Sequence, residues 1–177
     1  MDDDPVGAAE MLHSIEAVLG RTKHLLSIFT LREETQPKGI VNIIQEIVTQ
    51  TRLAHPKVTI NLNAYEGIDK FQLSIGRLLP IVFENLIRNS IQHCGDSVTI
   101  NIDVGFNNQN VEVRVSDNGP GIPSIIREHL FKKGVSTNST GMGLYLAKSV
   151  VTAFDGTIEH LDSDVGASFL IRFPILN

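Results

Sequence analysis

Residues 111–122 read Val-Glu-Val-Arg-Val-Ser-Asp-Asn-Gly-Pro-Gly-Ile, and they are the most informative part of the sequence for its fold. Its first half alternates apolar and polar residues, which predicts a strand over residues 111–115 with one buried face. Asp117 follows, and its carboxylate can accept a hydrogen bond from an exocyclic amine such as that of adenine. Gly119 and Gly121 let the backbone turn sharply and approach a flat ligand without a Cβ clash. An ordinary turn after a strand is the alternative, since Asp, Asn, Gly and Pro are the usual turn residues.

The residues around this stretch predict a mixed order of helices and strands. A second clear strand over residues 98–106 precedes it, and Asn-Asn-Gln-Asn at 107–110 predicts a hairpin loop. Periodicity predicts further strands at 58–62, 71–75, 157–161 and 168–173, helices at 40–53, 77–93 and 143–154, and a short helical turn from Pro123. Because helices do not strictly alternate with strands, we expect an α+β fold with one sheet and helices on one face.

The N-terminal part carries a different pattern. Residues 1–8 are expected to fray, residues 9–32 to form a helix with a wide apolar stripe, and residues 33–39 to form a linker. A lone helix with such a stripe would leave a sticky patch. We therefore expect it to pack against a partner helix, as in a dimeric four-helix bundle. Packing back onto its own domain is the alternative.

Length and composition restrict the class of protein. The chain has 177 residues, 42% of them hydrophobic and 20% charged, which is typical of one globular domain with an appendage. The formal net charge is -5 and no broad basic stripe is present, which argues against nucleic acid as a partner. No run of about 18 apolar residues is present, so no membrane span is expected. The single cysteine, Cys94, excludes an internal disulfide and fits the cytoplasm.

Residues 84–89, Glu-Asn-Leu-Ile-Arg-Asn, lie within the predicted helix at 77–93. Asn85 and Asn89 are four residues apart, so their amides share one helix face. An amide oxygen is a hard, neutral ligand that suits a Mg²⁺ ion coordinated mostly by phosphates and water. The alternative is that both residues simply make hydrogen bonds on a solvated helix.

Two further segments are suited to a phosphate chain. Residues 140–144, Thr-Gly-Met-Gly-Leu, open a helix, and exposed N–H groups at a helix N-terminus bind anions. They are not a Walker A loop, because no Gly-Lys-Ser/Thr follows. Upstream, residues 130–134 combine an apolar pair with the cations Lys132 and Lys133. A hinge before the helix and a solvated lysine pair are the respective alternatives.

Together, and in this order, the motifs resemble the ATP-binding catalytic domain of sensor histidine kinases, of the gyrase/Hsp90/histidine kinase/MutL ATPase superfamily. Residues 84–89 match the N box and residues 115–123 the G1 box. Residues 130–134 resemble the F box, residues 140–144 the G2 box, and Gly-Ala-Ser-Phe at 166–169 the closing strand. The resemblance covers about residues 39–174. It implies a Bergerat-type, two-layer α/β sandwich at 37–177, preceded at 1–36 by part of a dimerisation hairpin.

The resemblance also implies the roles of individual residues. Asp117 would recognise adenine, Asn89 with Asn85 would hold Mg²⁺, and Arg127 in a lid over about 122–140 is a candidate for reaching the γ-phosphate. The other implied nucleotide-binding residues are Gly119, Gly121 and Ile122 at the base, Lys132 and Lys133 in the lid, Thr140, Gly141, Met142, Gly143 and Leu144 at the phosphates, and Ser168 in the closing strand. The family transfers the γ-phosphoryl group of ATP to a histidine of a dimerisation helix, and then to an aspartate of a response regulator.

The sequence departs from the family pattern at several positions. Gln92 stands where many members carry Lys or Arg, so one phosphate cation is absent. Asn85 stands where the ATPase branch has its water-activating Glu, so little ATP hydrolysis is expected. Neither His13 nor His24 lies in an acceptor motif, so the phosphoacceptor is expected outside this chain, in a longer sensor that could be tethered to a membrane. An anti-sigma-type serine kinase and a non-catalytic ATP-sensing scaffold stay open as alternatives.

Overall fold

The computed structural model describes residues 39–68, 78–95, 97–107, 109–134 and 142–175. By its contacts the chain divides into two compact units, Met1–Gln36 and Pro37–Asn177, and all described residues belong to the second. The expected helix at 9–32, the expected strand at 71–75, and the candidate residues Thr140 and Gly141 lie outside the described residues. The assignment of residues 1–36 to a dimerisation hairpin therefore stays a prediction.

The described elements follow the predicted order closely. The helices are α2 (Ile40–Ala54), α3 (Leu79–Cys94), α4 (Ser124–Arg127) and α5 (Gly143–Ala153). The strands are β1 (Thr59–Ala64), β2 (Thr99–Asn107), β3 (Asn110–Asp117), β4 (Thr157–Leu161) and β5 (Ser168–Pro174). Apart from the strand at 71–75, each element expected between residues 40 and 174 is present, with ends that differ by one or two residues.

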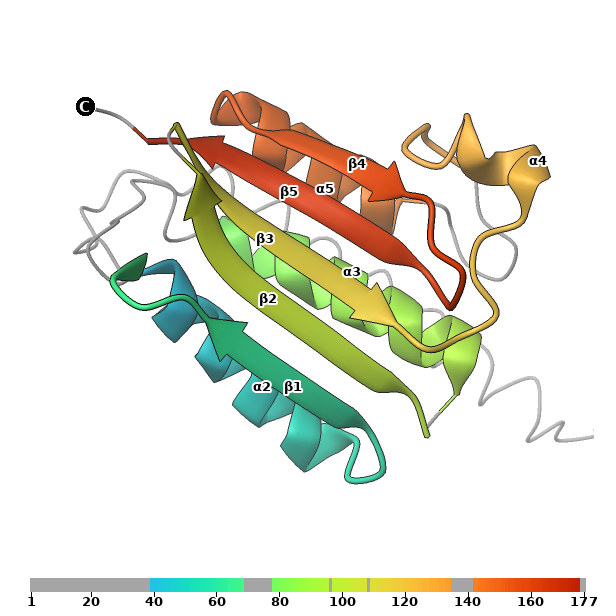
Figure 1. Cartoon of the computed structure of the whole chain (residues 1–177). Coiled ribbons are helices and arrows are strands. Elements are labelled where there is room, and N and C mark those ends of the chain that lie inside the picture. Colours follow the sequence, from blue (N-terminus) through green and yellow to red (C-terminus); the bar gives the residue numbers. More distant parts are fainter. Residues whose placement is uncertain (1–38, 69–77, 96, 108, 135–141, 176–177) are drawn as a thin grey trace, which may run out of the picture. The chain divides into compact units, whose positions relative to one another are not determined.

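The strands form one sheet in the order β1-β2-β3-β5-β4 (Figure 1). β1 runs parallel to β2, whereas β3 is antiparallel to both β2 and β5, and β4 is antiparallel to β5. Helices α2, α3 and α5 cover one face of the sheet, and no described helix covers the other face (Figure 1). The expected α+β fold, a two-layer sandwich with a mixed sheet, is confirmed.

Strand alternation decides which side chains enter the core. Every second residue of the central strands faces the helices and is buried: Ile100, Ile102 and Val104 in β2, Val111, Val113 and Val115 in β3, and Phe169, Ile171 and Phe173 in β5. Phe83 of α3 and Phe173 are the largest fully buried side chains. Burying one such side chain contributes about 1.5–3 kcal/mol, so this row of contacts holds the two layers together.

The ends of α3 follow from local chemistry. Pro80 lies in its first turn, where the missing N–H costs no intrahelical hydrogen bond. Gly95, with φ of 79°, follows its last residue, and the Gly95 N–H donates to the carbonyl of Ile91 at 2.9 Å. This positive φ is the left-handed conformation that glycine adopts easily. The helix therefore stops at Cys94, next to the end of β3.

The β2–β3 hairpin is tighter than expected. Asn107 and Asn110 pair across the ladder, so they end the two strands instead of lying in the loop. Asn107 Oδ1 accepts hydrogen bonds from the backbone N–H groups of Gln109 and Asn110, at 3.2 and 3.1 Å. Such side-chain bonding to the following backbone is the reason that Asn favours turns.

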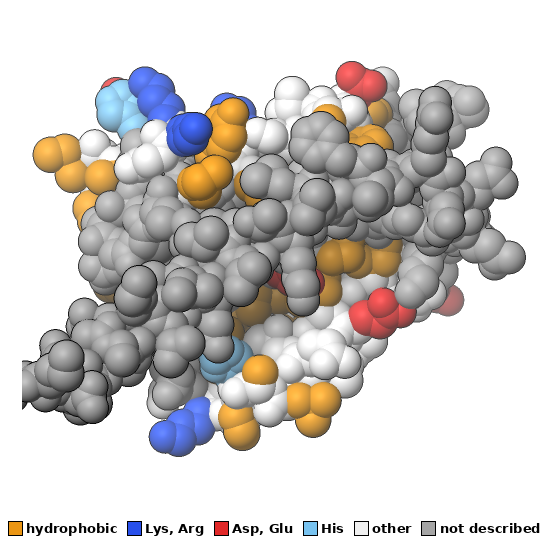
Figure 2. Space-filling view, turned by 180° about the vertical axis from the view of Figure 1, so that it is seen from behind, with side chains coloured by type: hydrophobic (Ala, Val, Ile, Leu, Met, Phe, Trp, Pro, Cys, Tyr) orange, Lys and Arg blue, Asp and Glu red, His pale blue; other side chains and the backbone are white. Residues whose placement is uncertain are grey.

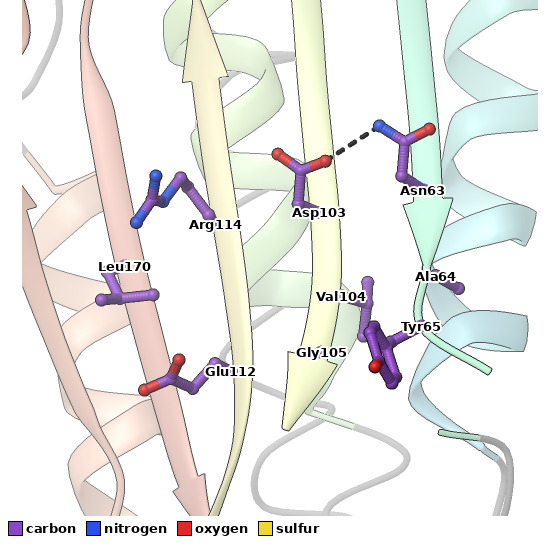
Figure 3. A pocket seen from close by; sticks show the side chains of 9 residues that line it. All are labelled: Asn63, Ala64, Tyr65, Asp103, Val104, Gly105, Glu112, Arg114 and Leu170. Carbon is purple, nitrogen blue, oxygen red and sulfur yellow. Dashed lines mark hydrogen bonds between the residues drawn. The ribbon is translucent and has the colours of Figure 1, made fainter. Parts of the chain in front are cut away.

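The sheet face opposite the helices carries a hollow of about 370 Å³ (Figure 3). The lining residues include Asn63, Asp103, Glu112, Arg114 and Leu170. Asp103 accepts a hydrogen bond from Asn63 Nδ2, and Glu112 accepts one from Arg172 Nε, both at 2.9 Å. None of the candidate nucleotide-binding residues lines this hollow, so it is separate from the site described next.

Candidate nucleotide-binding site

Asp117 ends β3 on the helix-covered side of the sheet. It follows Val115 by two residues, so strand alternation turns both side chains toward the helices, and it pairs with Ile100 of β2. The side chain is 7% exposed. A carboxylate at such a depth has to be hydrogen-bonded, because an uncompensated buried charge is costly.

Four donors surround the Asp117 carboxylate. Oδ1 accepts hydrogen bonds from the backbone N–H groups of Gly119 and Ala167, both at 3.0 Å. Oδ2 accepts one from Ser90 Oγ at 2.7 Å, and Cys94 Sγ lies 3.6 Å from Oδ1. The loops after β3 and before β5 and the end of α3 therefore meet at this one side chain.

The Cys94 thiol is strongly affected by this neighbour. Desolvation, the negative charge of Asp117 and the hydrogen bond to it raise the pKa of Cys94 from 9.0 to about 11. The thiol therefore stays protonated near neutral pH and acts as a weak donor. A thiol that stays protonated is a poor nucleophile, because the thiolate is the reactive form.

Glycine is required at two positions beside Asp117. At Gly166, with φ of 68°, a Cβ would lie 1.8 Å from the backbone oxygen of Asp117. At Gly119, a Cβ would lie 2.0 Å from Cys94 Sγ. Gly121 also has a positive φ, of 77°. The loops can close around Asp117 only because these positions lack side chains.

Sequence reasoning missed four contributors to this cluster: Ser90, Cys94 as a donor, Gly166 and the amide of Ala167. One signal was available, because Ser90 and Cys94 are spaced i, i+4 and so share a helix face. Nothing local connects that face to Asp117, which lies 27 residues after Ser90. Only the packing of α3 on the sheet brings them together.

Ser168 is separated from Asp117 by the sheet. The register pairs Ser168 with Ser116, the residue before Asp117, so the two serines share the face opposite the helices. Its neighbour Ala167 donates to Asp117 through the backbone. The predicted role of the Ser168 hydroxyl in nucleotide binding stays a prediction.

The two asparagines of α3 differ in their hydrogen bonding. Asn85 is 4% exposed; its Nδ2 donates to the carbonyl of Ile81 at 2.6 Å, and its Oδ1 accepts a hydrogen bond from Arg88. Asn89 is half-buried, and its side-chain amide has no hydrogen bond among the described residues. Among the described residues, therefore, nothing occupies the hard amide oxygen of Asn89, the kind of ligand that a divalent cation prefers, whereas Asn85 bonds within α3.

Helix α5 begins beside Asn85. A Cβ at Gly143, the first residue of α5, would lie 2.9 Å from Asn85 Oδ1, so this glycine allows the close approach of α3 and α5. Met142 takes the N-cap position and makes no side-chain cap, and no acidic residue lies in the first turn. Met142, Gly143 and Leu144 are all half-buried. No described side chain therefore caps the first N–H groups of α5. An anion site requires N–H groups that are left uncapped in this way.

The segment after Gly121 carries the basic residues. Arg127 Nη1 forms an ion pair with Asp162 at 3.0 Å, and Arg127 Nε donates to the carbonyl of Ile122 at 2.9 Å. Lys132 and Lys133 are exposed. On the helix side of the molecule, Lys and Arg side chains gather at the corner where α4 lies (Figure 2).

Two aromatic contacts fasten this segment to the sheet. The ring of Phe131 packs edge-on against Phe169 of β5, with centroids 6.3 Å apart, and Lys148 Nζ of α5 lies 5.3 Å from the Phe131 centroid. The ring of His160 packs on Phe169 at 5.8 Å. Burial, followed by the charge of Arg127, lowers the pKa of His160. The base of the segment is thus anchored between β5 and α5.

No cluster of three His, Cys, Asp or Glu side chains that could hold a metal ion occurs in the described part of the chain. A cation at this site would therefore not have such a cluster among the described residues, whereas Asn89 offers an amide oxygen. Such a ligand fits a cation that receives most of its ligands from a phosphate chain and water.

The family follows from comparison with known proteins. The family model of histidine kinase-, DNA gyrase B-, and HSP90-like ATPases matches residues 74–177. The chain therefore belongs to this family. The match includes the N box, the cluster around Asp117 and the N-terminus of α5, so these residues lie in an ATP-binding domain.

The curated relatives are sensor kinases. A probable C4-dicarboxylate sensor kinase of Halalkalibacterium halodurans is 35% identical over 104 residues, which cover 54% of this chain and 20% of that protein. The adaptive-response sensory kinase SasA of a Synechocystis strain is 28% identical over 173 residues, covering 91% of this chain and 44% of that protein. The chain thus spans less than half the length of either relative.

Solved structures match the fold. Full-length ShkA in complex with AMPPNP gives a TM-score of 0.75 at 19% identity, covering 100% of this chain and 40% of that one. Histidine kinase ThkA in complex with the response regulator TrrA gives 0.73 at 20% identity, covering 99% of this chain and 53% of that one. In the described part of the chain, no helix is long and apolar enough to span a bilayer.

Proposed function

We propose that this chain is the ATP-binding catalytic part of a two-component sensor histidine kinase. In this role it passes the γ-phosphoryl group of ATP to a histidine outside the chain, for relay to an aspartate of a response regulator. The observation that carries the proposal is the buried Asp117 carboxylate, held by α3 and two loops beside the free amide of Asn89 and the uncapped start of α5. The sensor-kinase relatives support the reaction class.

Different residues bind the two ends of the nucleotide. Asp117 accepts from the 6-amino group of adenine, and Gly119, Gly121 and Ile122 shape the base pocket. At the other end, the N–H groups from Met142 to Leu144 bind the phosphates, and Lys132 and Lys133 add positive charge. Release of Arg127 from Asp162 would give a third cation. Phosphoryl transfer depends on such positioning and charge neutralisation more than on covalent chemistry by the protein.

Asn89 is the residue best suited to hold Mg²⁺, since no described residue donates to its amide oxygen, whereas Asn85 Oδ1 already accepts one hydrogen bond from Arg88. The ion, when bound, would neutralise charge on the phosphate oxygens. In the transfer, the bond between the γ-phosphorus and the β–γ bridging oxygen breaks. A bond from phosphorus to an imidazole nitrogen forms, and ADP leaves with the bridging oxygen.

The proposed partners follow from this role. They are the dimerisation and phosphoacceptor helices of the same protein, within a homodimer, and the receiver domain of a response regulator. A structure with a response regulator is known for ThkA, which has the same fold. The proposed location is the cytoplasmic side of a sensor.

Calorimetric titration with ATP tests the proposal, with and without Mg²⁺, on the wild type and on Asp117→Asn. The substitution keeps the shape but replaces an acceptor oxygen by a donor. A lost hydrogen bond to a charged group costs about 1.5–3 kcal/mol, so affinity should fall roughly 10- to 100-fold. Asp103→Asn, on the far sheet face, is the matched control and should bind as the wild type does. Equal affinities for all three proteins would contradict the proposal.

A second experiment identifies the residue that accepts the phosphoryl group. Labelled ATP is incubated with this chain and a longer chain that includes the dimerisation hairpin, followed by acid treatment. Acid-labile label on the hairpin is the expected result. Acid-stable label would indicate a serine kinase, and ATP binding without label would indicate a sensing scaffold.

A further inference from the structure

The two oxygens of the Asp117 carboxylate are unequally occupied. Oδ1 accepts two backbone hydrogen bonds, from Gly119 and Ala167, and also lies beside the Cys94 thiol. Oδ2 accepts one, from Ser90 Oγ, and no other described residue donates to it. An ionised carboxylate offers about four lone-pair positions, two on each oxygen. Oδ1 is therefore filled, and Oδ2 keeps one open position.

Ser90 determines where that open position points. The Ser90 and Asp117 side chains are both buried, at 5% and 7% exposure, and their bond of 2.7 Å is short and charge-assisted. Backbone amides hold one oxygen and Ser90 holds the other. Rotation of the carboxylate would break hydrogen bonds at both ends, so the plane of the group is fixed.

We propose that Ser90 is a positioning residue for base recognition, aiming the single open acceptor of Asp117 at the 6-amino group of adenine. The inference rests on the nucleotide-binding function proposed above. Guanine would present two neighbouring N–H donors, which a carboxylate receives best with both oxygens free. With Oδ1 filled, the arrangement favours a base that presents one exocyclic amine.

Cys94 contributes less than Ser90 to the orientation of the Asp117 carboxylate. Its sulfur lies one helical turn beyond Ser90 and 3.6 Å from Oδ1, which already has two stronger donors. A thiol is a weak donor. Replacement of Cys94 by Ala should therefore disturb base recognition less than replacement of Ser90.

A comparison of two nucleotides tests the role of Ser90 directly. The affinity for ATP is measured against that for purine riboside triphosphate, which lacks only the 6-amino group. In the wild type, loss of the amine should weaken binding roughly 10- to 100-fold, the range for a hydrogen bond to a charged group. In Ser90→Ala this ratio should fall to about threefold or less, because the acceptor is no longer aimed. Affinity for the analogue itself should change by about twofold at most.

The controls separate positioning from structural damage. Ser149→Ala removes an exposed helical hydroxyl that bonds the Tyr145 carbonyl, and should leave the ratio unchanged. Ser90→Thr keeps the hydroxyl and should restore the ratio if it melts like the wild type. If Ser90→Ala weakens both nucleotides equally, or neither, Ser90 has no positioning role and the inference is wrong. Equal ATP affinity in the wild type and Asp117→Asn would overturn the proposed function itself.

Discussion

The pKa of the Cys94 thiol depends in part on the neighbouring carboxylate of Asp117. The thiol is half-buried at the last residue of α3 and lies 3.6 Å from Oδ1 of the carboxylate. Desolvation is the largest cause of its raised pKa, and the charge and hydrogen bond of Asp117 are the next two. Because this is the only cysteine in the chain, its chemistry can be followed without interference.

The pKa of Cys94 can be measured through its rate of alkylation against pH. In the folded protein the thiolate should appear with a midpoint of about 11, against 9.0 for an ordinary thiol. At pH 9 the folded protein should therefore react about fiftyfold more slowly than the urea-unfolded chain. Since the unfolded chain loses its proton first, this group should lower the free energy of unfolding as pH rises from 9 to 11.

Asp117→Asn provides the comparison for this measurement. It removes the negative charge but leaves the burial, so the pKa of Cys94 should fall part of the way toward 9.0. A wild-type midpoint near 9 would show that the thiol is neither desolvated nor in contact with the carboxylate.

Among the elements, the loop between β4 and β5 depends most on a single residue. Gly166 brings this loop against the end of β3, where the Asp117 N–H donates to the Ala167 carbonyl at 3.0 Å and the Ala167 N–H donates to Asp117 Oδ1 at the same distance. The loop thus holds β3 through both backbone and side chain. It can do so only with glycine at 166, because a Cβ would overlap the Asp117 carbonyl.

Gly166→Ala should therefore be severely destabilising. A positive φ alone costs roughly 1–2 kcal/mol for a residue with a Cβ, and the 1.8 Å overlap adds to that, so the free energy of unfolding should fall by at least about 3 kcal/mol. Gly67→Ala is the matched control, since Gly67 has φ of 89° and open space around it. Urea unfolding measures both variants; a similar small loss in each would mean that the loop moves to admit a Cβ.

The whole second unit is organised so that the site lies at one end of the sheet. The helix layer and the sheet share one core. At one end of that core, the loops after β3 and before β5 meet the end of α3 (Figure 1). Among the described residues, the buried apolar core spans residues 40–173. The apolar stripe predicted at 9–32 lies outside the described residues, and its packing against a partner helix stays a prediction.

Removal of residues 1–36 should leave the second unit folded and change its assembly. The shortened chain should unfold at a similar temperature and keep its ATP affinity within about twofold, because the contacts of Asp117 all lie beyond residue 89. Light scattering should report a dimer for the full chain and a monomer for the shortened one. A full chain that is strictly monomeric at high concentration would favour packing of the N-terminal helix onto its own domain.

The sequence determined the elements and the identity of the central side chains. Alternation in β2 and β3 and the helical spacing in α2 and α3 are local patterns, so they could be read directly. Asp117, Asn89, Gly119 and Gly121 were named as candidates through short motifs whose order resembles that of the family. Local chemistry sets these features, and the printed sequence contains all of it.

Only the tertiary structure shows which contacts those side chains make. The strand order, with β5 between β3 and β4, brings Ala167 to Asp117, and the packing of α3 adds Ser90 and Cys94. The hydrogen bonds of Asn85 to Arg88 and Ile81, and the absence of one to the Asn89 side chain among the described residues, could not be read from the spacing of the two asparagines. Such contacts depend on long-range packing of the core, which no local periodicity records.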